Sequence, residues 1–159
     1  MVDPGHVRRM MQQYRYDGEI PSLTASAARR EMECKKAVQL FSELVRKVRR
    51  HKDVMQIHLN AAKQLELRAE TAHFLLNHYE EIIAGESLSA VPRKKAEQLL
   101  KKNKTAKGSF IRQYLGFWKK TRTQECASWI FDAVIEELSV LTGERRFRGV
   151  PTAYEQGGR

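Results

Sequence analysis

A basic segment is the strongest chemical signal in the sequence. Residues 92–122 contain eleven Lys and Arg residues and one acid, Glu97, so this segment alone matches the chain's net charge of +10. Such a charge density attracts polyanions through its long-range field and through the release of counterions. We therefore expect contacts with nucleic-acid phosphates from Arg93, Lys94, Lys95, Lys101, Lys102, Lys104, Lys107, Arg112, Lys119, Lys120 and Arg122.

A shorter basic cluster lies within residues 46–52 and is the second choice for a phosphate-binding surface. It consists of Arg46, Lys47, Arg49, Arg50 and Lys52. An anionic membrane surface is the alternative target of either cluster.

Aromatic residues interleave the main basic segment after residue 108. Aromatic faces beside cations can stack the bases of a single strand. Their spacing along a helix also suits a core, and it favours a core role for Phe110, Tyr114, Phe117 and Trp118. A helix-turn-helix reader needs a turn of about three or four residues, whereas we expect a longer connection here. The pattern therefore favours contacts with the phosphate backbone over reading of base sequence.

The sequence lacks the motifs of common enzymes and metal sites. It has no Gly-x-Ser-x-Gly elbow, His-Glu-x-x-His pair, Walker loop or Gly-x-Gly-x-x-Gly turn. A di-iron helical bundle needs two Glu-x-x-His motifs, and only Glu70–His73 is present. Neighbouring acids such as Glu136 and Glu137 point about 100° apart on a helix and are expected to face solvent. We expect a non-enzymatic protein without a metal or cofactor.

The remaining candidates for chemistry have ordinary structural explanations. Cys34 and Cys126 form no Cys-x-x-Cys motif, which favours two unpaired thiols. His51 and His58 are one heptad apart, and their places in the pattern suggest polar seam residues or a turn.

The longest predicted helical segment runs from Ser22 to Ala84 without Gly or Pro, and the other elements are expected to pack around it. Apolar residues recur in it at alternating three- and four-residue steps, which is the period of packed helices. The run is either one long helix or two antiparallel helices that meet between Arg49 and Val54. The predicted seam consists of Cys34, Ala37, Phe41, Leu44, Val48, Met55, Ala62, Leu65, Ala69, Ala72, Leu76, Tyr79 and Ile83.

Shorter helices are predicted on either side of this run. An amphipathic helix follows Asp3-Pro4 and ends near Gly18. After a boundary at residues 85–92, a helix to Asn103, a loop to Gly108 and a second helix to about Lys120 form a basic helix-loop-helix. A last amphipathic helix, rich in acids, ends before Gly143.

These elements predict an all-α bundle without a β-sheet, built on the long helix or hairpin. We expect one domain over residues 1–148, with the long helix or hairpin at 22–84 and the basic and acidic helices at 92–142, followed by a mobile tail at 149–159. We expect a homo-oligomer through the heptad seam, because the seam alanines Ala37, Ala62, Ala69 and Ala72 allow close helix approach. If the helix is unbroken, a dimer is the simplest way to bury its seam. No signal peptide or membrane span is recognisable, which favours a cytoplasmic or nuclear protein.

The leading functional hypothesis is nucleic-acid binding, to DNA or RNA, in a regulatory, packaging or replication-accessory role. One alternative is an oligomeric scaffold or adaptor that binds a partner protein through its heptad surface. The other is a matrix-like protein on anionic membrane.

Overall fold

The computed structural model describes residues 6–118 and 129–144, with side chains described at 6–109 and 131–144. Every regular element in these ranges is an α-helix, which confirms the predicted all-α class. The helices are α1 (His6–Tyr16), α2 (Ile20–Lys47), α3 (Lys52–Asn77), α4 (Tyr79–Ala84), α5 (Ala90–Trp118) and α6 (Trp129–Leu141). The predicted tail and the Asp3-Pro4 start lie outside the described residues.

The chain forms two compact units, and each is described by itself. One unit comprises Tyr14–Tyr79 and contains the hairpin of α2 and α3. The other, here called unit 1, combines Met1–Gln13 with Glu80–Arg159. The expected single domain over residues 1–148 stays a prediction.

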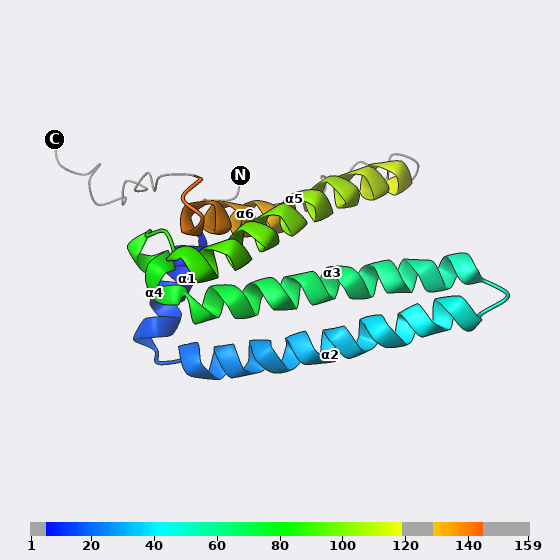
Figure 1. Ribbon diagram of the computed structural model, residues 1–159, viewed down its shortest axis with the longest axis horizontal. Coiled ribbons are helices and arrows are strands. Elements are labelled where there is room, and N and C mark those ends of the chain that lie inside the picture. The colour runs from blue at the N-terminus through cyan, green and yellow to red at the C-terminus, as the bar shows by residue number, and fades with distance from the viewer. Residues whose placement is uncertain (1–5, 119–128, 145–159) are drawn as a thin grey trace. The chain divides into compact units, whose positions relative to one another are not determined.

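Helices α2 and α3 lie side by side and run in opposite directions (Figure 1). The rings of Phe41 and His58 stack with centroids 5.8 Å apart near the reversal, and Glu31 contacts His73 farther from it. The run between Ser22 and Ala84 is therefore two antiparallel helices rather than one. A further interruption at His78 separates α3 from α4.

The reversal at residues 48–51 needs neither glycine nor proline. Val48 adopts an extended conformation, and its N–H still donates to the carbonyl of Leu44. His51 takes a left-handed conformation with φ 56°, which turns the chain into α3. A non-glycine residue in this region is uncommon and costs about 1 kcal/mol or more. This reversal overlaps the break predicted between Arg49 and Val54 and begins one residue earlier.

The seam between α2 and α3 differs in part from the predicted register. Leu44, Leu65 and Ala72 are exposed, so their predicted places in the seam are wrong. Val45 is half-buried and Leu59 is buried instead. Neighbouring apolar residues such as Leu44 and Val45 point about 100° apart, and the hydrophobic pattern alone does not select between them.

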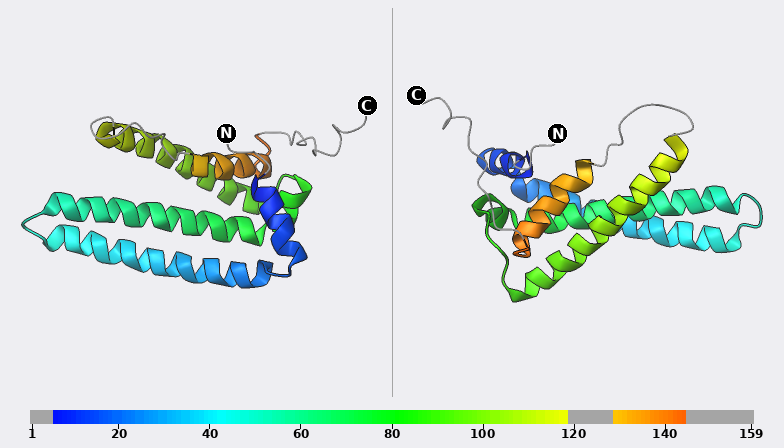
Figure 2. Two further views of the ribbon diagram at one scale, coloured as in Figure 1. Left: turned by 180° about the vertical axis from the view of Figure 1, so that it is seen from behind. Right: turned by 90° about the horizontal axis from the view of Figure 1, so that it is seen from above.

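In unit 1, α6 packs alongside α5 (Figure 2). Leucines of the two helices and Ile82 of α4 are almost fully buried and form the core. The segment between α4 and α5 is fastened to the end of α6 by a hydrogen bond from the N–H of Leu88 to the carbonyl of Leu141, 2.8 Å long. The apolar members of this core are Ile82, Leu88, Ala96, Leu99, Leu100, Phe131, Leu138, Val140 and Leu141.

The predicted helix-loop-helix is wrong, because α5 continues without a break through residues 103–108. Asn103 is buried rather than in a loop, and its side-chain amide donates to the carbonyl of Leu99, 2.9 Å away. A single glycine such as Gly108 costs a helix only about 1 kcal/mol. Helix formers around it and the packing on α6 outweigh that cost. The basic residues from Arg93 to Arg112 therefore lie along one continuous helix.

Several other predicted boundaries agree with the structure. Helix α1 ends just before Gly18, as predicted, and this glycine has a positive φ of 70°. The boundary after α4 begins at Gly85, with φ 69°. Gly143, with φ 73°, follows the end of α6 as expected for a C-terminal cap. Helix α5 begins at Ala90, so Pro92 lies in its first turn, where a missing N–H is tolerated.

Candidate functional site

The exposed side of α5 carries the first candidate surface. Ala96, Leu99, Leu100 and Asn103 form its buried row. Helical spacing places Lys94 and Lys101, one heptad apart, on the opposite side, and both are exposed. Lys95 and Lys102 form a neighbouring row with the same spacing. Seven residues rise about 10 Å along a helix, so the same pattern of cations repeats at that interval.

Other cations of the predicted set are neutralised by acids within unit 1. Lys104 Nζ lies 2.9 Å from Glu144 Oε2, and Lys107 pairs with Asp132 of α6. Arg93 Nε lies 3.4 Å from Glu97 Oε1, one turn along the same helix. These contacts turn part of the basic segment toward the protein itself. They divide α5 into a side whose cations lie opposite the buried row and a side whose cations are paired with acids.

Four predicted residues cannot be placed in this surface. Arg112 belongs to α5, but its side chain is outside the described set. Lys119, Lys120 and Arg122 lie outside the described residues. The side chains of the aromatic set, Phe110, Tyr114, Phe117 and Trp118, are also outside it, so neither base stacking nor a core role is tested.

The second basic cluster lies at the reversal between α2 and α3. Arg46, Lys47, Arg49, Arg50 and Lys52 are all exposed. Lys47 Nζ is 3.8 Å from Glu43 Oε2, and both side chains are mostly exposed, so this pair contributes little to stability. The cluster is compact because the chain reverses within it. This cluster belongs to the hairpin unit, whereas the surface on α5 belongs to unit 1.

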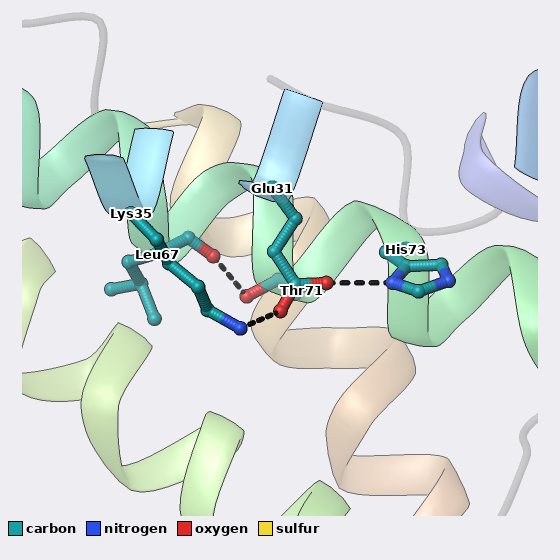
Figure 3. Close-up of polar contacts among 5 residues, drawn as sticks. All are labelled: Glu31, Lys35, Leu67, Thr71 and His73. Atoms are coloured by element: carbon teal, nitrogen blue, oxygen red, sulfur yellow. Dashed lines mark hydrogen bonds and ion pairs between the residues drawn. The ribbon is translucent and has the colours of Figure 1, made fainter. Parts of the chain in front are cut away.

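A polar network crosses the seam between α2 and α3 (Figure 3). Glu31 Oε2 is 2.6 Å from His73 Nδ1, and Glu31 Oε1 accepts a 2.5 Å hydrogen bond from Lys35 Nζ. The bond from Lys35 is the main reason that the pKa of Glu31 is lowered, and His73 adds to the effect. Thr71 Oγ1 donates to the carbonyl of Leu67, 2.7 Å away.

This network has the geometry of a structural clamp. The Thr71 hydroxyl donates to a backbone carbonyl on its own helix. His73 of the Glu-x-x-His motif contacts the carboxylate of α2. Among the described residues, no group of three His, Cys, Asp or Glu side chains is arranged to hold a metal ion.

A buried ion pair joins three helices of unit 1, and sequence analysis missed it. Arg8 Nη2 lies 3.2 Å from Glu137 Oε2, and Arg8 Nε donates to the carbonyl of Ile82, 2.9 Å away. Glu137 is fully buried, so the expectation that it faces solvent is wrong. Its spacing of three residues from Val134 and four from Leu141, which places it at the edge of the apolar side of α6, was the available signal.

The carboxyl group of Glu137 is in an unfavourable place for a charge. Burial raises the pKa of Glu137 to about 7, although the Arg8 charge acts in the opposite direction. Its Oε1 atom is buried without a hydrogen-bond partner. The pair fixes α1 against α4 and α6, and it gives unit 1 a group that titrates near neutral pH.

Comparison of the chain with protein-family models, curated proteins and solved structures finds no match. The site must therefore be interpreted from its own geometry. Across residues 6–118 and 129–144, no helix combines the length and apolar character that a membrane crossing requires.

Proposed function

We propose that this protein binds nucleic acid, without catalysing a reaction, through phosphate contacts from the outward side of α5. The observation that supports the proposal is the separation of cations on this helix. Lys94 and Lys101 face away from the buried row, whereas Lys104 and Lys107 pair with acids of the same unit. Lysines on an exposed, rigid helix can reach phosphates without disturbing a core.

A helix of this kind suits backbone contacts better than base reading. Phosphate contacts fix position and supply sequence-independent affinity, while base reading requires side chains that match base edges. Specific readout typically uses Arg, Asn and Gln side chains. The described outward side of α5 carries mainly Lys, and Gln98 is the one residue of these three types there. A regulatory, packaging or replication-accessory role on DNA or RNA is consistent with such binding.

An unbroken helix would need a second chain to cover its seam, whereas the two halves of the run pair with each other within the α2–α3 hairpin. Self-association stays a prediction, as does the heptad hairpin's use as a scaffold.

The test compares two variants that remove equal charge from the same helix. Lys94→Gln/Lys101→Gln removes outward cations, and Lys104→Gln/Lys107→Gln removes paired ones. Fluorescence anisotropy with duplex DNA, single-stranded DNA and RNA of equal length measures affinity between 50 and 200 mM salt. For duplex DNA, each lost phosphate contact should lower the salt slope by about 0.9 and affinity at 0.1 M salt by roughly tenfold.

We expect the outward variant to lose both slope and affinity at every sequence, and the paired variant to change them little. Circular dichroism must show that both variants keep the helical content of the parent. Equal losses in the two variants would show that only total charge matters. Absence of parental binding at 50 mM salt would contradict the proposed function itself.

A further inference from the structure

The half of the hairpin nearest the reversal carries large apolar side chains that are not in a core. We call residues 34–65 the distal hairpin. Within it, Leu40 is 61% exposed, Ile57 66% and Leu65 55%. Leu44 and Val54 are 43% and 39% exposed. Single exposed apolar residues are normal on a protein surface, but a contiguous group indicates an interaction surface.

These side chains form two rows on one face of the hairpin. On α2, the spacing of Ala37, Leu40 and Leu44 places them along one side, and on α3 the same holds for Val54, Ile57, Ala61 and Leu65. The stack of Phe41 on His58 places this part of α2 beside this part of α3, so Leu40 and Ile57 lie at similar levels along the hairpin. We call these two rows the apolar face.

The distal hairpin is also strongly basic. It contains eight Lys and Arg residues but only two acids, Glu43 and Asp53. Neither acid lies in the apolar rows, and Glu43 is paired with Lys47. The cations of the reversal, residues 46–52, adjoin one end of the apolar face. An occupant must therefore cover aliphatic side chains and supply negative charge at that end.

Three possible occupants fit these features poorly. A second copy would bring two strongly basic distal hairpins together, which like-charge repulsion opposes. Nucleic acid would satisfy the cations but leave the aliphatic rows uncovered. An anionic bilayer favours Trp and Tyr at its interface, and residues 34–65 contain neither.

We propose that the apolar face binds an amphipathic helix of a partner protein, with acidic residues at the end that meets the reversal. Helix-in-groove recognition uses apolar anchors at i, i+3 or i+4, and i+7. The α3 row from Val54 to Leu65 spans about 17 Å at 1.5 Å per residue, which matches roughly three turns of a partner helix. The small side chains Ala37 and Ala61 permit close approach within the rows.

The experiment uses a designed peptide of eighteen residues with a leucine stripe and glutamates at one end. A second peptide has the same composition but a scrambled order that destroys the stripe. Titration calorimetry measures binding to the full chain and to Ile57→Gln/Leu65→Gln. Met32→Gln is the matched control, because Met32 is 52% exposed on α2 but lies outside the distal hairpin.

We expect the striped peptide to bind and the double variant to weaken its binding at least tenfold. The Met32 variant and the Lys94→Gln/Lys101→Gln variant should bind within about twofold of the parent, which separates this surface from the one on α5. Arg49→Gln/Arg50→Gln should weaken binding several-fold, and less at high salt.

Several results would overturn the proposal. They are equal binding of the scrambled peptide, an equal loss in the Met32 variant, and absence of peptide binding. Sedimentation that shows a dimer dissociated by Ile57→Gln/Leu65→Gln would assign the face to a second copy. Binding to phosphatidylserine vesicles that requires Ile57 and Leu65, without peptide binding, would assign it to a membrane. A fall in melting temperature of more than about 10 °C in the double variant would show that the face is covered within the chain.

Discussion

The hairpin of α2 and α3 and unit 1 are both helical, but they bury their side chains differently. Unit 1 encloses Ile82, Leu99, Leu100, Leu138 and Leu141 almost completely. Most seam positions of the hairpin are only half-buried. A seam between two helices is covered from one direction, whereas helices that meet from several directions can close a core. The hairpin therefore leaves apolar side chains exposed for contacts with other molecules, whereas unit 1 buries such side chains in its own core.

The two regions also place the same acidic residue type in opposite electrostatic environments. Glu31 of the hairpin is held by Lys35 and His73, and its pKa is lowered. Glu137 of unit 1 is fully buried, and its pKa is raised despite the nearby Arg8. Partner contacts dominate in the first case and desolvation dominates in the second. The contrast shows that depth of burial decides whether an ion pair keeps its carboxylate charged.

The largest expected difference between the regions concerns truncation of a leucine. Leu138→Ala in unit 1 should lower the free energy of unfolding by about 2–5 kcal/mol, because it leaves a cavity in a closed core. Leu44→Ala in the hairpin should stay within about 0.5 kcal/mol, since Leu44 is 43% exposed. Urea denaturation followed by circular dichroism measures both. Similar losses of unfolding free energy in the two variants would show that the hairpin and unit 1 do not differ in packing as described.

The next effect is the pH dependence that Glu137 gives to unit 1. Below pH 4.5 its carboxyl is protonated in the folded and unfolded states, so it contributes no cost. From pH 4.5 to about 7 only the folded state keeps the proton, and stability falls as pH rises, by at most about 3 kcal/mol. Glu137→Gln should flatten this part of the stability curve. An unchanged slope in the variant would show that burial does not control this carboxyl.

A smaller effect of opposite sign is expected from Glu31. Its lowered folded pKa contributes stability that is present above pH 4.5 and is lost as pH falls below that value. Glu31→Gln should cost about 1 kcal/mol at neutral pH, and the difference from the parent should shrink in acid. Thermal melts of parent and variant at several pH values measure this. A difference that grew in acid would reverse the assigned sign.

Local sequence patterns were sufficient for the elements with clear boundaries. Gly85 and Gly143 stop helices with left-handed backbone, which glycine adopts at little cost. The cluster at residues 46–52 indicated a possible break in the long run, and the structure reverses there. The hydrophobic stripe of α6 was visible from Phe131 to Leu141. In each case the deciding interactions lie within a few residues of one another.

Features that depend on distant contacts were not predictable in this way. No local pattern marks Arg8 as buried, because its partner Glu137 is 129 positions away. Asn103 resembled a loop residue because its buried hydrogen bond to Leu99 depends on α5 staying helical against α6. Lys104 and Lys107 pair with acids in or just after α6, and this pairing divides the basic segment. Composition alone gives the number of lysines in the segment but not which of them are paired.

The contact between Arg8 and Glu137 also constrains the order in which the chain can fold. During synthesis from the N-terminus, α1 emerges long before α6, so its buried arginine has no carboxylate to meet until residue 137 has been made. The contacts of α2 with α3 close much shorter loops and can form earlier. Because an antiparallel hairpin brings its own ends near each other, its formation shortens the effective loop between α1 and α4. Early formation of the hairpin thus lowers the loop-closure entropy that must be lost when the two separated segments of unit 1 come together.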